Sequence, residues 1–243
     1  MNYLNSEELL KRLVHAINKE ESKDLKSYDE RVKYWMNKFS SNGALKWDDK
    51  ILDLESQYLK SCFVKKKLYN CYEIKSLSLV DEEFKDKIIV WDEDVSSMVI
   101  DAIVVPSSKD IISGNDNKEL HDIYYSNGIK LRKKILNIMN GEKLSKDEVL
   151  ITRSYGILAD YIMHVNYNDI KTSILNVLEC ARVNMIKTIA ICLSNKLEEV
   201  NLVYDTIIEY LGQYNDYFDK IIIAIENKDV REEFIEDKNK ELR

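Results

Sequence analysis

The stretch of sequence that decides the fold covers residues 88–105 and reads IIVWDEDVSSMVIDAIVV. It contains two short apolar runs, 88–90 and 100–105, which are rich in β-branched residues and are separated by a polar segment. Short runs of this composition are typical of strands that are buried on both faces of a sheet. The stretch therefore predicts two strands of a covered sheet.

Four more runs of this kind follow, at residues 149–152, 161–165, 189–192 and 221–225. Helical patterns alternate with them: about His121 to Asn140 with Gly141 as the stop, Asp169 to Val183, Glu198 to Leu211 with Gly212 as the stop, and a last helix from near Asn227. The charged tail from Glu236 to Arg243 is expected to be frayed. Strands that alternate with helices predict a three-layer α/β/α sandwich around a mixed, mainly parallel sheet.

The first 73 residues have a different pattern and predict three helices. Asn5 with Glu8 and Ser27 with Glu30 have the spacing of helix-capping pairs, and a third helix is expected to begin near Asp48 or Asp49. These helices are too short to bury their apolar faces alone. We therefore expect an N-terminal helical extension, residues 1–73, packed on an α/β domain formed by residues 74–243.

The overall composition limits the possible functions. The net charge is −7, which argues against binding to nucleic-acid phosphates, and no apolar run is long enough to span a membrane. No secretion signal is visible, and the four cysteines form no CxxC pair. We expect a cytoplasmic protein with reduced thiols and no cofactor.

Five pieces of the chain, in order and spacing, resemble macrodomains. The run 89–104 resembles their opening strand, Asp-Ile-Thr motif and Val-Asp-Ala-Ile-Val strand; the other pieces are ITRSY at 151–155 with YIMH at 161–164, the helix 174–181, IKTIA at 186–190, and KIIIAI at 220–225. The N-terminal helices, including LESQYL at 54–59, resemble the extension of the zinc-containing branch from bacterial ADP-ribosylation operons. The resemblance implies the α/β/α sandwich and an ADP-ribose cleft at the carboxyl ends of the strands.

The resemblance implies a role for several residues. Asp94 falls where macrodomains hydrogen-bond the adenine amine, and Val95 where they make a backbone contact; a turn cap is the alternative role for Asp94. The Asn that orients the distal ribose is replaced by Ser108, and only Gly114 is left of the first glycine-rich loop. Ser194 and Asn195 replace the second phosphate loop, and Glu226 replaces an aromatic residue that stacks near adenine. Without their glycines, the loops bring backbone amides less close to a diphosphate.

The zinc site of the related branch has no counterpart here, because no cysteine lies between Cys71 and Cys180. His121 or Tyr124 falls at the position of the ligating His, and the spacing leaves both alignments open. Asp116, His121 and Asp122 could gather a metal, but solvated caps are the more common role of such residues, so we predict no metal. His15 and His164 lie in apolar patterns and are expected to be structural.

The sequence is compatible with three functions. The leading hypothesis is a degenerate macrodomain that binds ADP-ribose, a related adenine nucleotide or an ADP-ribosylated protein weakly, or else a protein partner, without hydrolysis. The second is an active protein-ADP-ribose hydrolase that uses the replacement residues Ser108, Asp110, Asp116 and His121. The third is a structural or regulatory protein with a filled cleft.

Overall fold

The computed structural model describes residues 5–74, 84, 86–107, 118–145, 148–193, 196–214 and 216–241, with only the backbone of residues 118–121 and 241. Seven strands form one sheet: β1 (Tyr69–Asn70), β2 (Ile88–Trp91), β3 (Met98–Pro106), β4 (Val149–Arg153), β5 (Ala159–Val165), β6 (Thr188–Cys192) and β7 (Lys220–Ala224). The main path runs β2-β7-β6-β3-β5-β4, and β1 pairs with β3. Every pairing is parallel except β4 with β5. The predicted mixed, mainly parallel sheet is confirmed.

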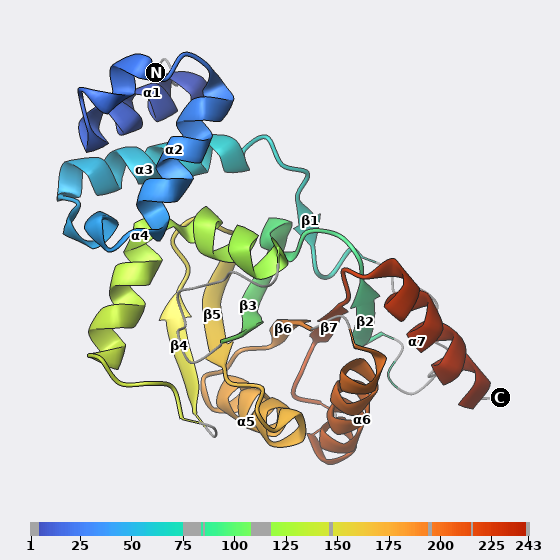
Figure 1. Ribbon diagram of the computed structural model, residues 1–243. Helices are drawn as coiled ribbons and strands as arrows, with labels where there is room; N and C mark the ends of the chain where they lie inside the picture. The colour runs from blue at the N-terminus through green and yellow to red at the C-terminus, as the bar shows by residue number, and fades with distance from the viewer. Residues whose placement is uncertain are drawn as a thin grey trace.

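Helices cover both faces of this sheet (Figure 1). On one face, α5 (Ile170–Val183), α6 (Leu197–Tyr214) and α7 (Lys228–Glu241) pack on a core that includes Ile88 and Val90. On the other face, α4 (Lys118–Met139) packs on a core that includes Ile89 and Trp91. Successive residues of β2 thus point to opposite faces, and both faces are buried, as the composition of the strand predicts.

The N-terminal residues form the three predicted helices, α1 (Ser6–Ile17), α2 (Tyr28–Ser40) and α3 (Asp49–Phe63), with two 3₁₀ helices, η1 (Glu21–Asp24) and η2 (Asn42–Lys46). The capping pairs are confirmed: Asn5 accepts from the Glu8 amide, and Ser27 and Glu30 form a reciprocal capping box. The helices share an apolar cluster that includes Leu13, Trp35 and Tyr58. Ile129 of α4 completes this cluster, so the extension packs on α4, as Figure 1 shows.

A break inside α4 makes this packing possible. Gly128 has φ of +69° within the helix, a conformation that glycine adopts at little cost. The next amide, that of Ile129, donates a 2.8 Å hydrogen bond to the buried carboxylate of Glu55 on α3. Glu55 also accepts a 2.9 Å bond from the indole of Trp35. The carboxylate thus caps the second half of α4 and ties it to the extension.

Several details differ from the sequence-based expectations. The helix α6 passes through Gly212, because the flanking Tyr210 and Leu211 are buried and the glycine has no unusual backbone. The expected frayed tail is instead helical to Glu241, because Phe234 is buried and Lys238 pairs with Asp205 of α6 at 2.9 Å. The strand β4 is only partly buried, since it lies at the edge of the sheet. No helix in the described part of the chain is long and apolar enough to cross a membrane.

Candidate functional site

The carboxyl ends of β2 and β7, which are neighbours in the sheet, open into a cavity of about 210 Å³. Its walls are formed by the last residue of each strand and the residues that follow, with one residue from α4: Trp91, Asp92, Glu93, Asp94, Asp122, Ala224, Ile225 and Glu226. Ligands of open α/β sheets bind at this edge, in the crevice outside the carboxyl ends of the strands. The cavity is therefore the candidate site.

The carboxylate of Asp94 forms part of the cavity wall and is held by several donors. Its Oδ1 accepts from the amide of Ser96 at 2.9 Å and so caps the short 3₁₀ helix η3 (Val95–Ser97). Its Oδ2 accepts from the ammonium of Lys66 at 2.8 Å and from the Ser97 hydroxyl at 3.1 Å. Burial raises the pKa of Asp94, but the hydrogen bonds from Lys66 and Ser96 and the charge of Lys66 outweigh it and keep the pKa below its ordinary value. Asp94 is thus an ionised turn cap, and Oδ1 keeps one lone pair for a further donor.

The cavity is strongly acidic. Five of its eight lining residues are Asp or Glu, while the nearby cations Lys66 and Arg231 pair with Asp94 and Asp92. Glu226 is exposed at its rim, and the side chain of Val95 is buried behind it in the core between the sheet and α4. Such a lining repels phosphate and favours a neutral group that carries N–H donors.

Two buried polar groups at the same edge of the sheet have no hydrogen-bond partner among the described residues. They are the indole Nε1 of Trp91 and the hydroxyl of Tyr167 after β5. Buried polar atoms without a partner are uncommon, and a bound ligand or water is one way to satisfy them. This edge of the sheet therefore offers a ligand further donors, one of them in the wall of the acidic cavity itself.

Most of the site residues suggested by the sequence cannot be placed. Ser108, Asp110, Gly114, Asp116, Ser194 and Asn195 lie outside the described residues, and the side chain of His121, at the start of α4, is likewise not described. Asp94 and Glu226, which are far apart in the sequence, line the same cavity. Val95 lies next to Asp94 in η3.

Tyr124 does not line the cavity, and its side chain is buried in the core between the sheet and α4. Its hydroxyl lies 3.1 Å from Nδ1 of His164, whose Nε2 lies 3.0 Å from the hydroxyl of Thr152. Burial lowers the pKa of His164 to about 3, so the ring is neutral at physiological pH, and burial raises that of Tyr124 to about 12. The Thr152 hydroxyl lies within 3.5 Å of the Ile162 carbonyl, so donation runs from Tyr124 to Nδ1 and from Nε2 to Thr152. The structural role expected for His164 agrees with this arrangement.

The residues present do not fit the zinc site of the related branch. Within the described ranges, no group of three or more His, Cys, Asp or Glu side chains could hold a metal. Cys71 and Cys192 are buried, and all four sulfurs are free thiols.

No local pattern points to Lys66, which follows α3 and meets Asp94 only after folding. The stretch 88–105 includes Trp91, Asp92 and Glu93, but only their shared position at the end of β2 shows that they line a cavity. The sequence indicates only a possible metal-ligand role for Asp122, whereas in the structure this residue of α4 lines the cavity.

Comparison of the fold with known structures identifies its architecture. No protein-family model and no curated protein matches the chain in sequence. Among solved structures, it is similar to a Trypanosoma brucei macrodomain in complex with ADP-ribose (TM-score 0.62, 14% identity, 93% of this chain and 94% of that chain). It is also similar to the macro domain of ganglioside induced differentiation associated protein 2 (0.58, 15%, 70% and 96%) and to an Oceanobacillus iheyensis macrodomain with ADP (0.55, 20%, 65% and 93%). The chain therefore has the macrodomain fold.

Proposed function

We propose that this chain binds ADP-ribose or a related adenine nucleotide, free or attached to a protein, with the adenine base in the acidic cavity. The observation that carries the proposal is the position of Asp94, whose ionised carboxylate lines that cavity at the carboxyl end of β2. An exocyclic amine is a suitable donor to the remaining lone pair of Oδ1. The T. brucei and O. iheyensis structures of the same fold, which contain ADP-ribose and ADP, support this class of ligand.

The charge of the cavity determines how such a ligand would lie. Adenine is neutral and carries its own N–H donors, whereas a diphosphate would face Asp92, Glu93, Asp122 and Glu226 across a short distance. The base therefore belongs in the cavity, and the phosphates belong along the edge towards β6 and β3. There the loops have few glycines, so we propose that the diphosphate contributes little to affinity.

We further propose that the protein does not hydrolyse the ADP-ribosyl bond. The run 105–108 has no Asn for the distal ribose, and the sulfur ligands of a zinc-bound water are missing. His164 is neutral and bonded through both ring nitrogens, so it cannot serve as a base in the cleft. Binding without turnover is the function that these residues support best.

Calorimetric titration with ADP-ribose is the decisive experiment. We expect a dissociation constant no tighter than about micromolar, and Asp94→Asn should weaken it about tenfold by the loss of a charged acceptor. The control is Asp160→Asn, an exposed carboxylate at the amino end of β5, which should leave binding unchanged. Absence of heat with ADP-ribose, ADP and AMP at millimolar concentration would contradict the proposal.

A gain of affinity provides a second test. Glu226→Phe places a stacking surface at the rim of the cavity and removes one negative charge, so it should tighten ADP-ribose binding about tenfold. The matched control is Glu232→Phe on the exposed face of α7, which should have no effect. Equal affinities of the two variants would place the ligand elsewhere.

Hydrolysis is tested separately with an ADP-ribosylated protein as substrate. We expect no release of ADP-ribose above the uncatalysed rate. Release that is abolished by Ser108→Ala or His121→Ala would establish the hydrolase instead.

A further inference from the structure

A second and larger cavity lies in the N-terminal extension, far along the chain from the candidate site. It has a volume of about 510 Å³ and is bounded by α1, η1 and the start of α2. Cavities of about 300–1,000 Å³ are typical of ligand-binding sites. The two cavities have no lining residue in common.

The lining of this cavity is basic in an otherwise acidic chain. Six of its ten residues are Lys, Arg or His, and Glu8 is the one acid among them; the basic residues are Lys11, Arg12, His15, Lys23, Lys26 and Arg31. The whole chain has a net charge of −7. The cavity is therefore a local concentration of positive charge that attracts a negatively charged group.

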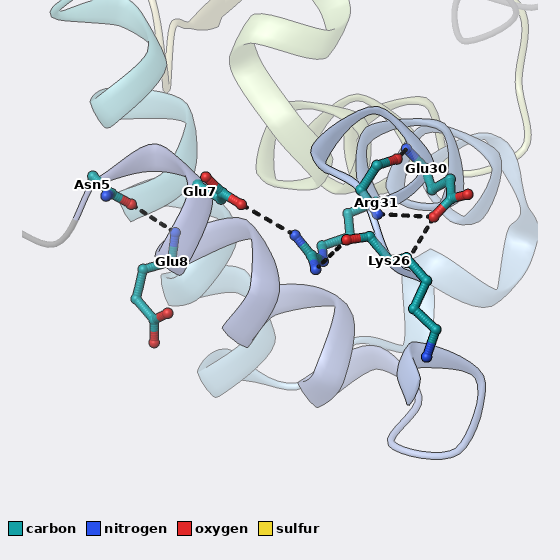
Figure 2. A network of polar contacts seen from close by, with 7 residues as sticks. Asn5, Glu7, Glu8, Lys26, Glu30 and Arg31 are labelled. Atoms are coloured by element: carbon teal, nitrogen blue, oxygen red, sulfur yellow. Dashed lines mark hydrogen bonds and ion pairs between the residues drawn. The ribbon is translucent and has the colours of Figure 1, made fainter. Parts of the chain in front are cut away.

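Not all of these cations are neutralised by neighbouring acids. Arg12 pairs with Glu8, Lys23 with Glu20, and Arg31 with Glu7. Among the described residues, the side-chain ammonium of Lys26 donates only to the carbonyl of Lys23, and Lys11 makes no hydrogen bond or ion pair. In Figure 2 the Lys26 side chain points away from Glu7 and Glu30, whose carboxylates bind Arg31 and the backbone amides before α2. Lys11 and Lys26 thus remain available to a ligand.

Two apolar residues also line the cavity. Val14, which belongs to the core of the extension, and the half-buried Leu25 contribute to its lining. Arg31 is fixed beside them by bonds to the Glu7 carboxylate and the Lys26 carbonyl (Figure 2). An occupant that combines negative charge with one apolar side chain would therefore contact both the cations and the apolar residues of this cavity.

We propose that this cavity docks an acidic segment of a partner protein, with one of its apolar side chains between Val14 and Leu25 and its carboxylates on Lys11 and Lys26. A nucleic acid fits the surroundings less well, because Glu7, Glu20 and Glu30 flank the basic rim and would repel the phosphates on either side. A short peptide places its charge only where the cations lie. This docking site is separate from the proposed nucleotide site and gives the protein a second binding surface, for a partner protein.

The test uses the full chain and a fluorescein-labelled peptide with four glutamates around a central leucine. We expect saturable binding that weakens as salt is added, since surface charges are screened. Replacing the central leucine by serine should weaken binding about fivefold, because an apolar contact is lost. Equal affinity of the two peptides, or tighter binding of a single-stranded oligouridylate than of either peptide, would overturn the proposal.

Charge reversal locates the site. Lys11→Glu with Lys26→Glu should weaken the peptide at least about tenfold, whereas the double control Lys46→Glu with Lys143→Glu, on exposed positions outside the cavity, should not. Thermal unfolding checks that both double variants are folded. Leu25→Ser tests the apolar contact with the peptide without changing the charge of the cavity. ADP-ribose titration of the same variants should be unchanged. Equal peptide binding by both double variants, or no binding by the unmodified chain at millimolar peptide, would refute the docking site.

Discussion

The side-chain ammonium of Lys66 lies 2.8 Å from Oδ2 of Asp94 and 2.8 Å from the hydroxyl of Ser96. Lys66 follows α3 of the extension, and Asp94 follows β2 of the sheet. The contact therefore joins the extension to the wall of the candidate site. It also fixes the turn that places the Asp94 carboxylate at the cavity.

The first prediction concerns the stability provided by this pair. Asp94→Ala should lower the free energy of unfolding by about 0.5–2 kcal/mol, since the cap of η3 is lost together with the ion pair. Lys66→Met should cost less, and a double-mutant cycle should give a coupling of about 0.2–1 kcal/mol, because both side chains are about one third exposed. Urea unfolding gives the free energy of unfolding of the unmodified protein, the two single variants and the double variant. Strict additivity of the two changes would show that the pair contributes no coupling.

Much of the fold could be predicted from local patterns. The runs around Ile89, Ile103 and Ile222 are β-branched and bounded by polar segments, so period and composition identified the strands. The capping pairs Asn5–Glu8 and Ser27–Glu30 identified helix starts for the same local reason. Helix ends were less predictable. Gly212 and the charged tail have breaking signals that tertiary packing of Leu211 and Phe234 overrides.

Only part of the candidate site could be suggested from the sequence. The resemblance to macrodomains pointed to Asp94 and Glu226, and the parallel pairing of β2 with β7 explains why the segments after these strands line one cavity. The Lys66 contact spans 28 residues and has no local signal. Glu55 sat in an ordinary helical pattern, and its role depends on the break at Gly128, which the sequence did not reveal.

The second prediction concerns Gly128. A Cβ there would lie 2.8 Å from both Oε2 of Glu55 and Cδ1 of Leu59, and the φ of +69° is unfavourable for other residues. Gly128→Ala should therefore lower stability by about 1–3 kcal/mol. Gly212→Ala is the matched control: nothing lies within 4 Å of its Cβ, so it should raise stability by about 0.5–1 kcal/mol. Chemical denaturation compares the two, and a stabilising Gly128→Ala would contradict the close approach of α3.

The third prediction concerns the buried chain from Tyr124 to Thr152. Tyr124→Phe removes the donor to Nδ1 of His164 and leaves a buried acceptor unpaired, which should cost about 1–3 kcal/mol of stability. Tyr155→Phe is the control, because Tyr155 is partly exposed and its hydroxyl makes no hydrogen bond in the described part of the chain. Thermal unfolding compares the melting temperatures of the two variants. Equal melting temperatures would show that the Tyr124 hydroxyl does not hold His164.

The last prediction concerns the pH dependence of stability, to which Glu55 and His164 contribute in opposite directions. Burial raises the pKa of Glu55 to about 7 from 4.5, although bonds from Ile129 and Trp35 and the charges of Lys130 and Lys133 oppose the shift. Its contribution is thus full below pH 4.5 and is lost as the pH rises through 7. Burial lowers the pKa of His164 to about 3 from 6.5, so its contribution is full above pH 6.5 and is lost as the pH falls towards 3. The two groups change the free energy of unfolding with pH in opposite directions between pH 4.5 and 6.5, so the stability of the unmodified protein should be nearly insensitive to pH there.

Glu55→Gln removes the contribution of Glu55 to this pH dependence. The free energy of unfolding of this variant, relative to the unmodified protein, should rise by about 3 kcal/mol between pH 4.5 and 7, whereas the exposed Glu142→Gln should show no such rise. Urea unfolding across this range makes the comparison, and parallel curves for Glu55→Gln and the unmodified protein would show that Glu55 is ionised throughout.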